Sequence, residues 1–231
     1  MTSPNVRWHV LPQGEAIAEA VAEHILRAAR RAISAHGGFR LVLAGGTTPE
    51  SAYRRLAEMS ADWSRWSIYY GDERCVPPGD ESRNSVMADR AWLDHVPIPR
   101  AHIHTVPAEH GPTRGAEEYG ATVRNALPFD FVLLGMGEDG HTASLFPGQE
   151  HDDDEPVVPV YDAPKPPPER VSVNTSALNQ SREVHIMVTG AGKRDAVRRW
   201  KAGEDLPVGR VHGQCGVDVW LDPEALDASA K

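Results

Sequence analysis

The stretch Phe129–Gly135, with the sequence FDFVLLG, is the most continuously apolar strand-like run in the chain. Strands that are buried on both faces of a parallel sheet have nearly continuous apolar sequences, whereas half-exposed strands alternate apolar and polar residues. The stretch therefore predicts a central strand of a parallel sheet, and a chain that contains such a strand must cover it on both sides.

The rest of the chain repeats a pattern of strand, loop and helix. Apolar residues at helical spacing between 15 and 35, with Ile17, Val21 and Ile25 on one stripe, predict an amphipathic helix. Strands are expected at 39–44, 67–71, 129–135, 170–174, 183–189 and 217–221, with a possible short one at 102–106, and further helices at 50–59, 84–95, 113–126 and from about 193 to 201. This alternation predicts the α/β class, with a mostly parallel sheet and helices on both faces.

We interpret residues 1–231 as a single domain. The acidic segment 149–156 and the proline-rich segment 163–169 are both predicted to be loops. The proline-rich segment is short, and strand-like sequence resumes at Arg170, so it is interpreted as an excursion within the domain and not as a linker.

Composition excludes several classes of function. The chain has 24 Lys and Arg against 33 Asp and Glu, a net charge of −9, which disfavours a nucleic-acid-binding protein. The two cysteines form no CxxC pair, so neither a disulfide scaffold nor a thiolate zinc site is expected. This use of cysteine predicts a cytoplasmic protein. The eleven histidines are scattered without an HExxH motif, and no metal site is predicted. No signal peptide and no membrane span is expected, because no stretch approaches about 18 apolar residues.

The most unusual loop residues follow four of the predicted strands, at 45–48, 72–74, 137–141 and 190–193. In open parallel sheets, ligands bind outside the carboxyl ends of the strands. The four loops are therefore expected to form one site.

The first of these loops is Gly45-Gly46-Thr47-Thr48, followed by Pro49. Glycines let the backbone approach an anion, and the N–H groups of the following helix together with two hydroxyls can hold a phosphate. The loop matches neither GxxxxGK[ST] nor GxGxxG. A tight turn with a threonine cap is the alternative interpretation.

The second loop is Asp72-Glu73-Arg74. Its carboxylates could act as bases or bind sugar hydroxyls, and Arg74 could bind an oxyanion or a carboxylate. Taken alone, the segment fits a solvated charged turn better.

The third loop places Asp139 two residues before His141, with glycines at 137 and 140. Imidazole titrates near neutral pH, and a neighbouring carboxylate can fix its tautomer and raise its basicity, which favours a general base. A helix-capping aspartate beside an incidental histidine is the alternative. In the fourth loop, Lys193 could supply a charge for a phosphate or be an ordinary surface lysine.

Several segments resemble the family that contains 6-phosphogluconolactonase and glucosamine-6-phosphate deaminase. They are LAGGTTPESAYRRL, YYGDERCVPP, DHVPIPRAHIH, FDFVLLGMGEDGHTASLFPG and VSVNTSALNQSREVHIMVTGAGKRDAV. The resemblance implies a Rossmann-like fold of the deaminase type and hydrolysis of 6-phospho-D-glucono-1,5-lactone to 6-phosphogluconate in the oxidative pentose phosphate pathway. It implies no redox cofactor and no catalytic metal.

The resemblance also implies roles for individual residues. His141 would be the general base that activates water, Asp139 would orient it, and Arg74 would stabilise the developing oxyanion or hold the substrate. A one-residue departure from the family pattern before Asn84 leaves the role of Asn84 open. Gly46, Thr47 and Thr48 would contact the substrate, its phosphate above all, with Lys193 and Arg170 supplying charge. Gly45, Asp72 and Gly137 are also expected to bind substrate.

Two other functions compete with the lactonase. Glucosamine-6-phosphate deaminase has Asp-Glu-Tyr where this chain has Asp72-Glu73-Arg74, and it has a glutamate shortly after the histidine, where this chain has none. A non-catalytic sugar-phosphate-binding protein would keep the phosphate loop without needing Asp139 and His141. The expected partner is a phosphorylated sugar lactone, with no nucleic acid and no membrane, and the protein is expected to be a monomer.

Overall fold

The computed structural model of the chain describes residues 5–226. Its strands are β1 (Val6–Val10), β2 (Phe39–Leu43), β3 (Trp66–Tyr70), β4 (Asp72–Arg74), β5 (Phe129–Gly135), β6 (Val157–Val160), β7 (Arg170–Val173), β8 (Ser181–Val188) and β9 (Val217–Leu221). Its helices are α1 (Gly14–His36), α2 (Thr47–Ala57), α3 (Asn84–Ala88, continued as a π-helical turn over Asp89–Leu93), α4 (Pro112–Ala126), α5 (Thr175–Leu178) and α6 (Arg194–Lys201). Short 3₁₀ turns occupy Trp63–Arg65, Arg100–His102, Ala108–His110, Ala191–Lys193, Pro207–Arg210 and Pro223–Ala225.

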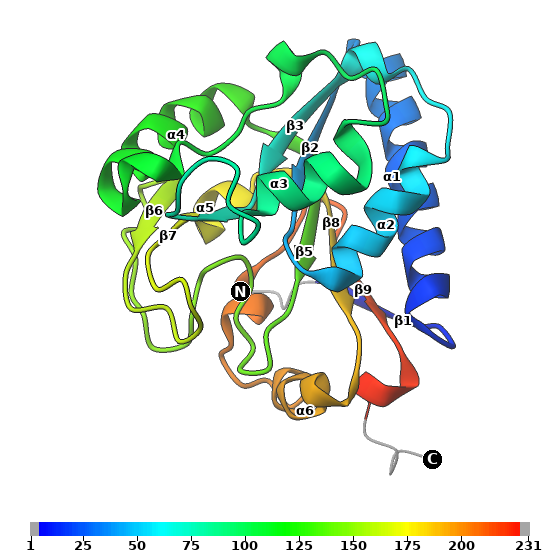
Figure 1. Cartoon of the computed structure of the whole chain (residues 1–231). Coiled ribbons are helices and arrows are strands. Elements are labelled where there is room, and N and C mark those ends of the chain that lie inside the picture. Colours follow the sequence, from blue (N-terminus) through cyan, green and yellow to red (C-terminus); the bar gives the residue numbers. More distant parts are fainter. Residues whose placement is uncertain (1–4, 227–231) are drawn as a thin grey trace.

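Six strands form a central parallel sheet in the order β1-β9-β8-β5-β2-β3. The apolar strand β5 lies inside this sheet between β8 and β2, and six of its seven residues are buried. The predicted fold class, a mostly parallel sheet with helices, is therefore confirmed. All six strands run in the same direction, so their carboxyl ends lie at one edge of the sheet (Figure 1).

One face of the central sheet is covered by α1 and α2, which run side by side in Figure 1. The predicted apolar stripe of α1 explains this packing, because Ile17, Val21 and Ile25 are completely buried. Gly37 ends the helix in a left-handed conformation with a φ of 85°, which glycine adopts at little cost.

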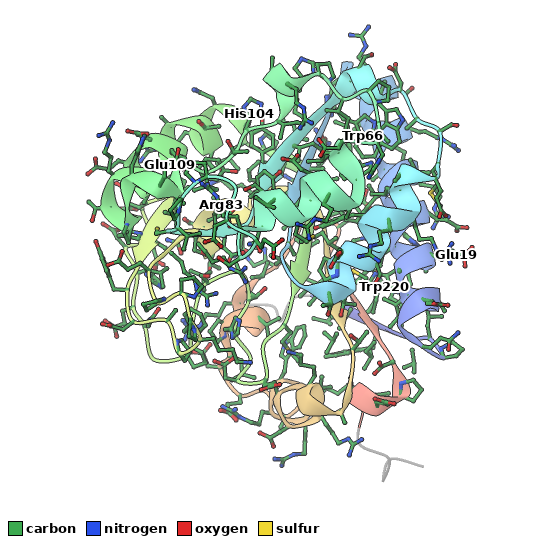
Figure 2. The ribbon with its side chains drawn as sticks, in the orientation of Figure 1. Glu19, Trp66, Arg83, His104, Glu109 and Trp220 are labelled. Atoms are coloured by element: carbon green, nitrogen blue, oxygen red, sulfur yellow. The ribbon has the colours of Figure 1, made fainter. Side chains whose placement is uncertain are left out.

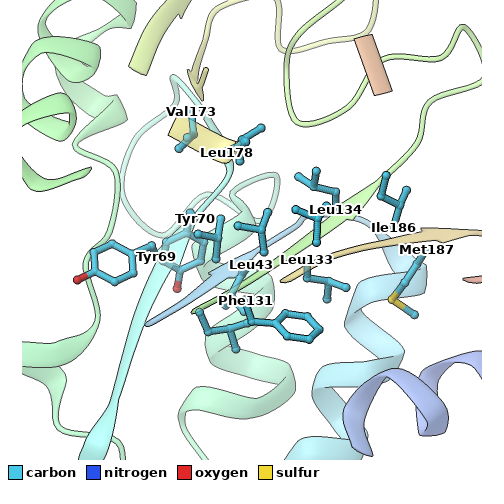
Figure 3. Close-up of a cluster of buried hydrophobic side chains, with 14 of the residues drawn as sticks. Leu43, Tyr69, Tyr70, Phe131, Leu133, Leu134, Val173, Leu178, Ile186 and Met187 are labelled. Carbon is cyan, nitrogen blue, oxygen red and sulfur yellow. The ribbon is translucent and has the colours of Figure 1, made fainter. Parts of the chain in front are cut away.

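The other face is covered by α5 and a second, smaller sheet, on which α4 packs (Figure 1). In Figure 3, Val173 of β7 and Leu178 of α5 lie on one side of the central strands, near Leu134. All three side chains are buried. The central sheet is therefore an interior layer, as the apolar sequence of β5 predicts.

The second sheet corrects the prediction of a loop at 72–74. Strand β4 pairs in antiparallel fashion with β7, with Asp72 opposite Ser172 and Arg74 opposite Arg170. Strand β6 pairs with the other edge of β7. Charged residues predict a loop when only local sequence is considered, but the ladder of β7 satisfies the backbone groups of this segment.

The strand suggested at 102–106 is wrong. Residues Arg100–His102 form a 3₁₀ turn, and the segment contributes a single bridge between Ile103 and Ile68. Strands β1 and β6 were not predicted. Strand β6 contains Pro159, which removes a backbone donor and is tolerated because β6 is an edge strand.

Within residues 5–226, no helix is long and apolar enough to cross a membrane. The single-domain interpretation of 1–231 includes residues outside the described part of the chain, and it stays a prediction.

Candidate active site

A cavity of about 400 Å³ opens where β2, β3, β5 and β8 end. Every predicted site residue except Asp139 lines it, and Asp139 contacts a lining residue. The lining residues predicted from the sequence are Gly45, Gly46, Thr47, Thr48, Asp72, Arg74, Gly137, His141, Arg170 and Lys193. The structure therefore brings together the four loops that were expected to form one site.

His141 and Asp139 form a hydrogen-bonded pair beside the cavity. The Nδ1 of His141 lies 2.6 Å from the Oδ1 of Asp139, and the same oxygen accepts the backbone N–H of His141 at 3.1 Å. A carboxylate can only accept, so the Nδ1 carries the proton and the Nε2 of the neutral ring has the free lone pair. The ring also packs against Phe146, with 4.6 Å between the ring centroids. The imidazole is thus held in one orientation and one tautomer.

Gly137 makes room for this pair. A Cβ atom at position 137 would lie 2.0 Å from the Nδ1 of His141 and 2.6 Å from the Oδ1 of Asp139. Any other residue would force the two side chains apart. The backbone N–H of Gly137 donates to the carbonyl of His141 at 2.8 Å, which closes the loop around the pair.

Burial and neighbouring charges determine the protonation of the pair. Burial lowers the pKa of His141, and the charge and hydrogen bond of Asp139 offset this only in part. Burial by itself raises the pKa of Asp139, but the hydrogen bonds and charge of His141 outweigh it and bring that pKa below its usual value. The histidine is therefore neutral and the aspartate ionised at neutral pH, which is the state that a general base needs.

The glycine–threonine loop forms the amino-terminal end of α2. Gly46 is the N-cap with a φ of 100°, and no side chain caps the helix, so the threonine-cap interpretation is wrong. The hydroxyl of Thr48 lies 2.7 Å from the hydroxyl of Thr189, which follows β8. This contact joins the helix terminus to the loop that carries Lys193. The backbone N–H groups at the start of α2 remain available to an anion.

Asp72 and Glu73 are buried, so the interpretation as a solvated turn is wrong. Asp72 lines the cavity and accepts hydrogen bonds from the Nδ2 of Asn84 at 3.0 Å and the hydroxyl of Ser144 at 2.6 Å. A Cβ at Gly45 would lie 2.0 Å from the Oδ1 of Asn84, so this glycine lets the amide approach. Asn84 therefore positions Asp72.

Glu73 has a structural role. Its carboxylate accepts the backbone N–H groups of Asn84 and Ser85 at 2.7 and 2.9 Å, so it binds the first turn of α3. The buried Arg83 lies 3.6 Å from Glu73 and donates to Glu109 at 3.0 Å. Figure 2 labels Arg83 and Glu109, which lie in the same region of the molecule.

The three predicted cations differ in how much of their hydrogen-bonding capacity is in use. Arg170 donates to the carbonyls of Pro167 and Lys165 at 3.0 and 2.7 Å. Arg74 donates to the carbonyl of Ser82, and its Nε is buried without an acceptor among the described residues. Burial lowers the pKa of the Lys193 ammonium, and no hydrogen-bond acceptor is found for it within residues 5–226.

Several residues of the site were missed. Ser144 and Phe146 follow His141 in the same loop, and Thr189 follows β8, so their proximity to predicted residues was an available signal. Lys165 lies in the proline-rich segment, where nothing in the local sequence indicates a site. Within the part of the chain that the structure describes, no group of three or more His, Cys, Asp and Glu side chains could hold a metal ion.

The chain is similar to known proteins over nearly its whole length. Residues 12–220 match the family model described as glucosamine-6-phosphate isomerases/6-phosphogluconolactonase. The chain is 35% identical over 241 residues to the 6-phosphogluconolactonase of Mycobacterium tuberculosis, with 96% of each chain covered. The crystal structure of 6-phosphogluconolactonase from Thermotoga maritima has a TM-score of 0.87 at 28% identity, covering 94% of this chain and 99% of that one. A monomeric glucosamine-6-phosphate deaminase, at 18% identity with a TM-score of 0.79 over 95% of this chain and 98% of that one, shares the fold.

Proposed function

Given that this chain belongs to the glucosamine-6-phosphate isomerase/6-phosphogluconolactonase family and is a lactone-hydrolysing enzyme, we propose that it converts 6-phospho-D-glucono-1,5-lactone to 6-phospho-D-gluconate with His141 as the general base. The observation that carries the proposal is the Asp139–His141 pair at the cavity, 2.6 Å apart, with the imidazole in the tautomer that can accept a proton. The reaction would be a step of the oxidative pentose phosphate pathway.

The phosphate of the substrate is assigned to the cleft between the start of α2 and the loop after β8. The hydrogen bond between Thr48 and Thr189 brings these two segments together, and Lys193 supplies a cation there. Backbone N–H groups at a helix terminus and a lysine are a favourable set of partners for a phosphate dianion. This end of the cavity would anchor the substrate away from the reacting carbon.

The lactone carbonyl is assigned to the region between His141 and Arg74. The Nε2 of His141 removes a proton from water as the water oxygen bonds to C1, and the carbonyl oxygen becomes an oxyanion. Arg74 lines the cavity, and its guanidinium is assigned as the donor for this oxyanion. When the C1–O5 bond breaks, the imidazolium returns its proton to the ring oxygen, and a carboxylic acid forms that ionises to the product carboxylate.

The assignment is tested with His141→Ala. We expect kcat above the uncatalysed rate to fall by about 10²–10⁴, since general-base assistance typically contributes that much. Binding of 6-phosphogluconate, measured by calorimetry, should change little because the phosphate partners remain. His212→Ala, an exposed histidine outside the cavity, is the matched control. A kcat close to that of wild type in the His141→Ala protein would exclude His141 as the base.

The deaminase alternative is disfavoured by the acids of the cavity. Among the lining residues that the structure describes, Asp72 is the only one with a carboxylate, and Phe146 packs on the histidine in the segment where the deaminase pattern has a glutamate. Incubation with glucosamine 6-phosphate should therefore release no ammonia. The same proposal includes that the protein is a cytoplasmic monomer and that it binds neither nucleic acid nor membranes.

A further inference from the structure

Glu138, Lys165 and Lys193 lie close together beside the cavity. The catalytic pair does not account for this arrangement. The Oε2 of Glu138 lies 3.5 Å from the Nζ of Lys165. Glu138 belongs to the loop that carries His141, whereas Lys165 belongs to the proline-rich segment 163–169. The ion pair therefore joins two loops that are distant in sequence.

Glu138 also faces the loop that carries Lys193. A Cβ at Gly192 would lie 3.1 Å from the Oε1 of Glu138, and the charge of Glu138 raises the pKa of Lys193 against the effect of burial. Lys165 and Lys193 both line the cavity, but Glu138 does not. The carboxylate thus lies beside two lysines that line the substrate site.

We propose that Lys165 is a second phosphate-binding lysine and that Glu138 is its resident counter-ion, which the phosphate of the substrate displaces from Lys165. This inference rests on the proposed function, since it takes a sugar phosphate as the ligand. It assigns a role in affinity to two residues outside the catalytic pair.

The electrostatics favour such an exchange. Lys165 and Glu138 are 65% and 60% exposed, and an ion pair between exposed side chains is worth at most about 1 kcal/mol. A phosphate ester carries nearly two negative charges at neutral pH and three acceptor oxygens, so it can contact both lysines at once. The dianion is therefore the stronger partner.

The backbone of Lys165 is fixed while its ammonium is free to move. The buried Arg170 donates to the carbonyl of Lys165 at 2.7 Å and to that of Pro167 at 3.0 Å, which attaches the proline-rich segment to the cavity wall. The exposed side chain can then change partner by rotation about its own bonds. No movement of the loop is required.

The proposal is tested by a double-mutant cycle of Glu138→Gln and Lys165→Met. The readouts are dissociation constants of 6-phosphogluconate and of inorganic phosphate, measured by calorimetry without turnover. Lys165→Met should weaken binding of 6-phosphogluconate about tenfold, because a charge-assisted contact is lost. Glu138→Gln should strengthen it about two- to fivefold, and this gain should be smaller in the Lys165→Met background, where only Lys193 remains beside Glu138.

Two kinds of control separate this mechanism from a general change of charge or of fold. Glu23→Gln removes an exposed carboxylate on α1, and Lys201→Met removes a lysine outside the cavity, so neither should alter the dissociation constants. The free energy of unfolding of the Glu138 and Lys165 variants, measured with urea, should stay close to wild type because both side chains are exposed.

The proposal is overturned if Lys165→Met leaves binding unchanged, if Glu138→Gln weakens binding, or if the gain is undiminished without Lys165. These outcomes differ from failure of the proposed function. A wild-type protein that does not hydrolyse the phosphorylated lactone would refute the function, whereas the binding constants test the lysine and its counter-ion separately.

Discussion

Gly137 is the residue on which the geometry of the Asp139–His141 pair depends most directly. Its position after β5 places the backbone against both side chains, with no space for a Cβ. The hydrogen bond from Asp139 then fixes the imidazole. Three residues within five positions therefore specify one reactive nitrogen, and a motif this local can be recognised in the sequence.

The first prediction concerns Gly137→Ala. The added methyl would lie 2.0 Å from the Nδ1 of His141, so the pair must shift. We expect kcat/KM to fall about 10²-fold, because small misplacements of reacting groups have effects of that size. The free energy of unfolding should fall by about 1–3 kcal/mol. Steady-state kinetics and urea unfolding measure the two effects. Gly38→Ala, where the nearest atom would be 3.6 Å away, should leave both quantities close to wild type.

The second prediction is the pH dependence of catalysis. Burial lowers the pKa of His141 below 6.5, so the basic form predominates at neutral pH, and kcat/KM should fall only as the pH drops through that lowered value. Asp139 raises this pKa, and Lys193 lowers it. The acid limb should therefore move to lower pH in Asp139→Asn and to higher pH in Lys193→Met. A limb at the same pH in all three proteins would refute this electrostatic account.

At the scale of elements, the short helix α3 depends on a carboxylate from a neighbouring strand. Glu73 of β4 accepts two backbone N–H groups at the start of α3, and α3 in turn carries Asn84, which holds Asp72 at the cavity. The helix has only five residues before its π-helical continuation, too few to be stable alone. The position of Asp72 is thus linked to the capping of α3.

The third prediction is that Glu73→Gln destabilises the protein by about 3 kcal/mol at neutral pH. The amide would present N–H groups to backbone N–H groups and leave the buried Arg83 with a weaker partner. Urea unfolding measures the change. Glu81→Gln removes an exposed carboxylate that pairs with Arg90 at 3.0 Å, and it should cost less than about 0.5 kcal/mol. Equal stabilities of the two variants would contradict the capping role.

At the scale of the whole molecule, the edge strand β1 is attached to the central sheet by a charged cluster. Asp218 of β9 binds Arg7 at 2.6 Å and His9 at 2.7 Å, and it lies 3.5 Å from the buried His185 of β8. Its side chain is 14% exposed, and hydrogen bonds from Arg7 and His9 outweigh burial and lower its pKa to about 2. None of these four residues lines the cavity.

The fourth prediction concerns Asp218→Asn. A carboxyl whose pKa falls from 3.8 to about 2 on folding contributes about 2 kcal/mol above pH 3.8, and this contribution is lost as the pH falls toward 2. The variant should be less stable than wild type by about that amount at pH 7, with a difference roughly half as large near pH 3. Urea unfolding at several pH values tests this. The kcat of the Asp218→Asn protein at pH 7 should match that of wild type, because Asp218 is outside the cavity.

The sequence by itself determined the elements and loops whose signals are local. The continuous apolar run of β5, the stripe of α1 and the glycine-rich loop at 137–141 were predicted where the structure has them. The loop predicted at 45–48 ends two residues earlier, because α2 begins at Thr47. These signals need only the periodicity of one element or the backbone freedom of a glycine. The resemblance of the sequence to a known family supplied the expected reaction. The parallel arrangement of the strands explains why the four loops lie together.

Only the tertiary structure decided which charged residues are buried and what they contact. The pairing of β4 with β7 places Arg74 opposite Arg170, and Ser144 beside Asp72, across long stretches of chain. The pairing of Lys165 with Glu138 likewise joins two separate loops. Such contacts depend on the register of strands that meet only after folding, and the local spacing of residues carries no information about that register.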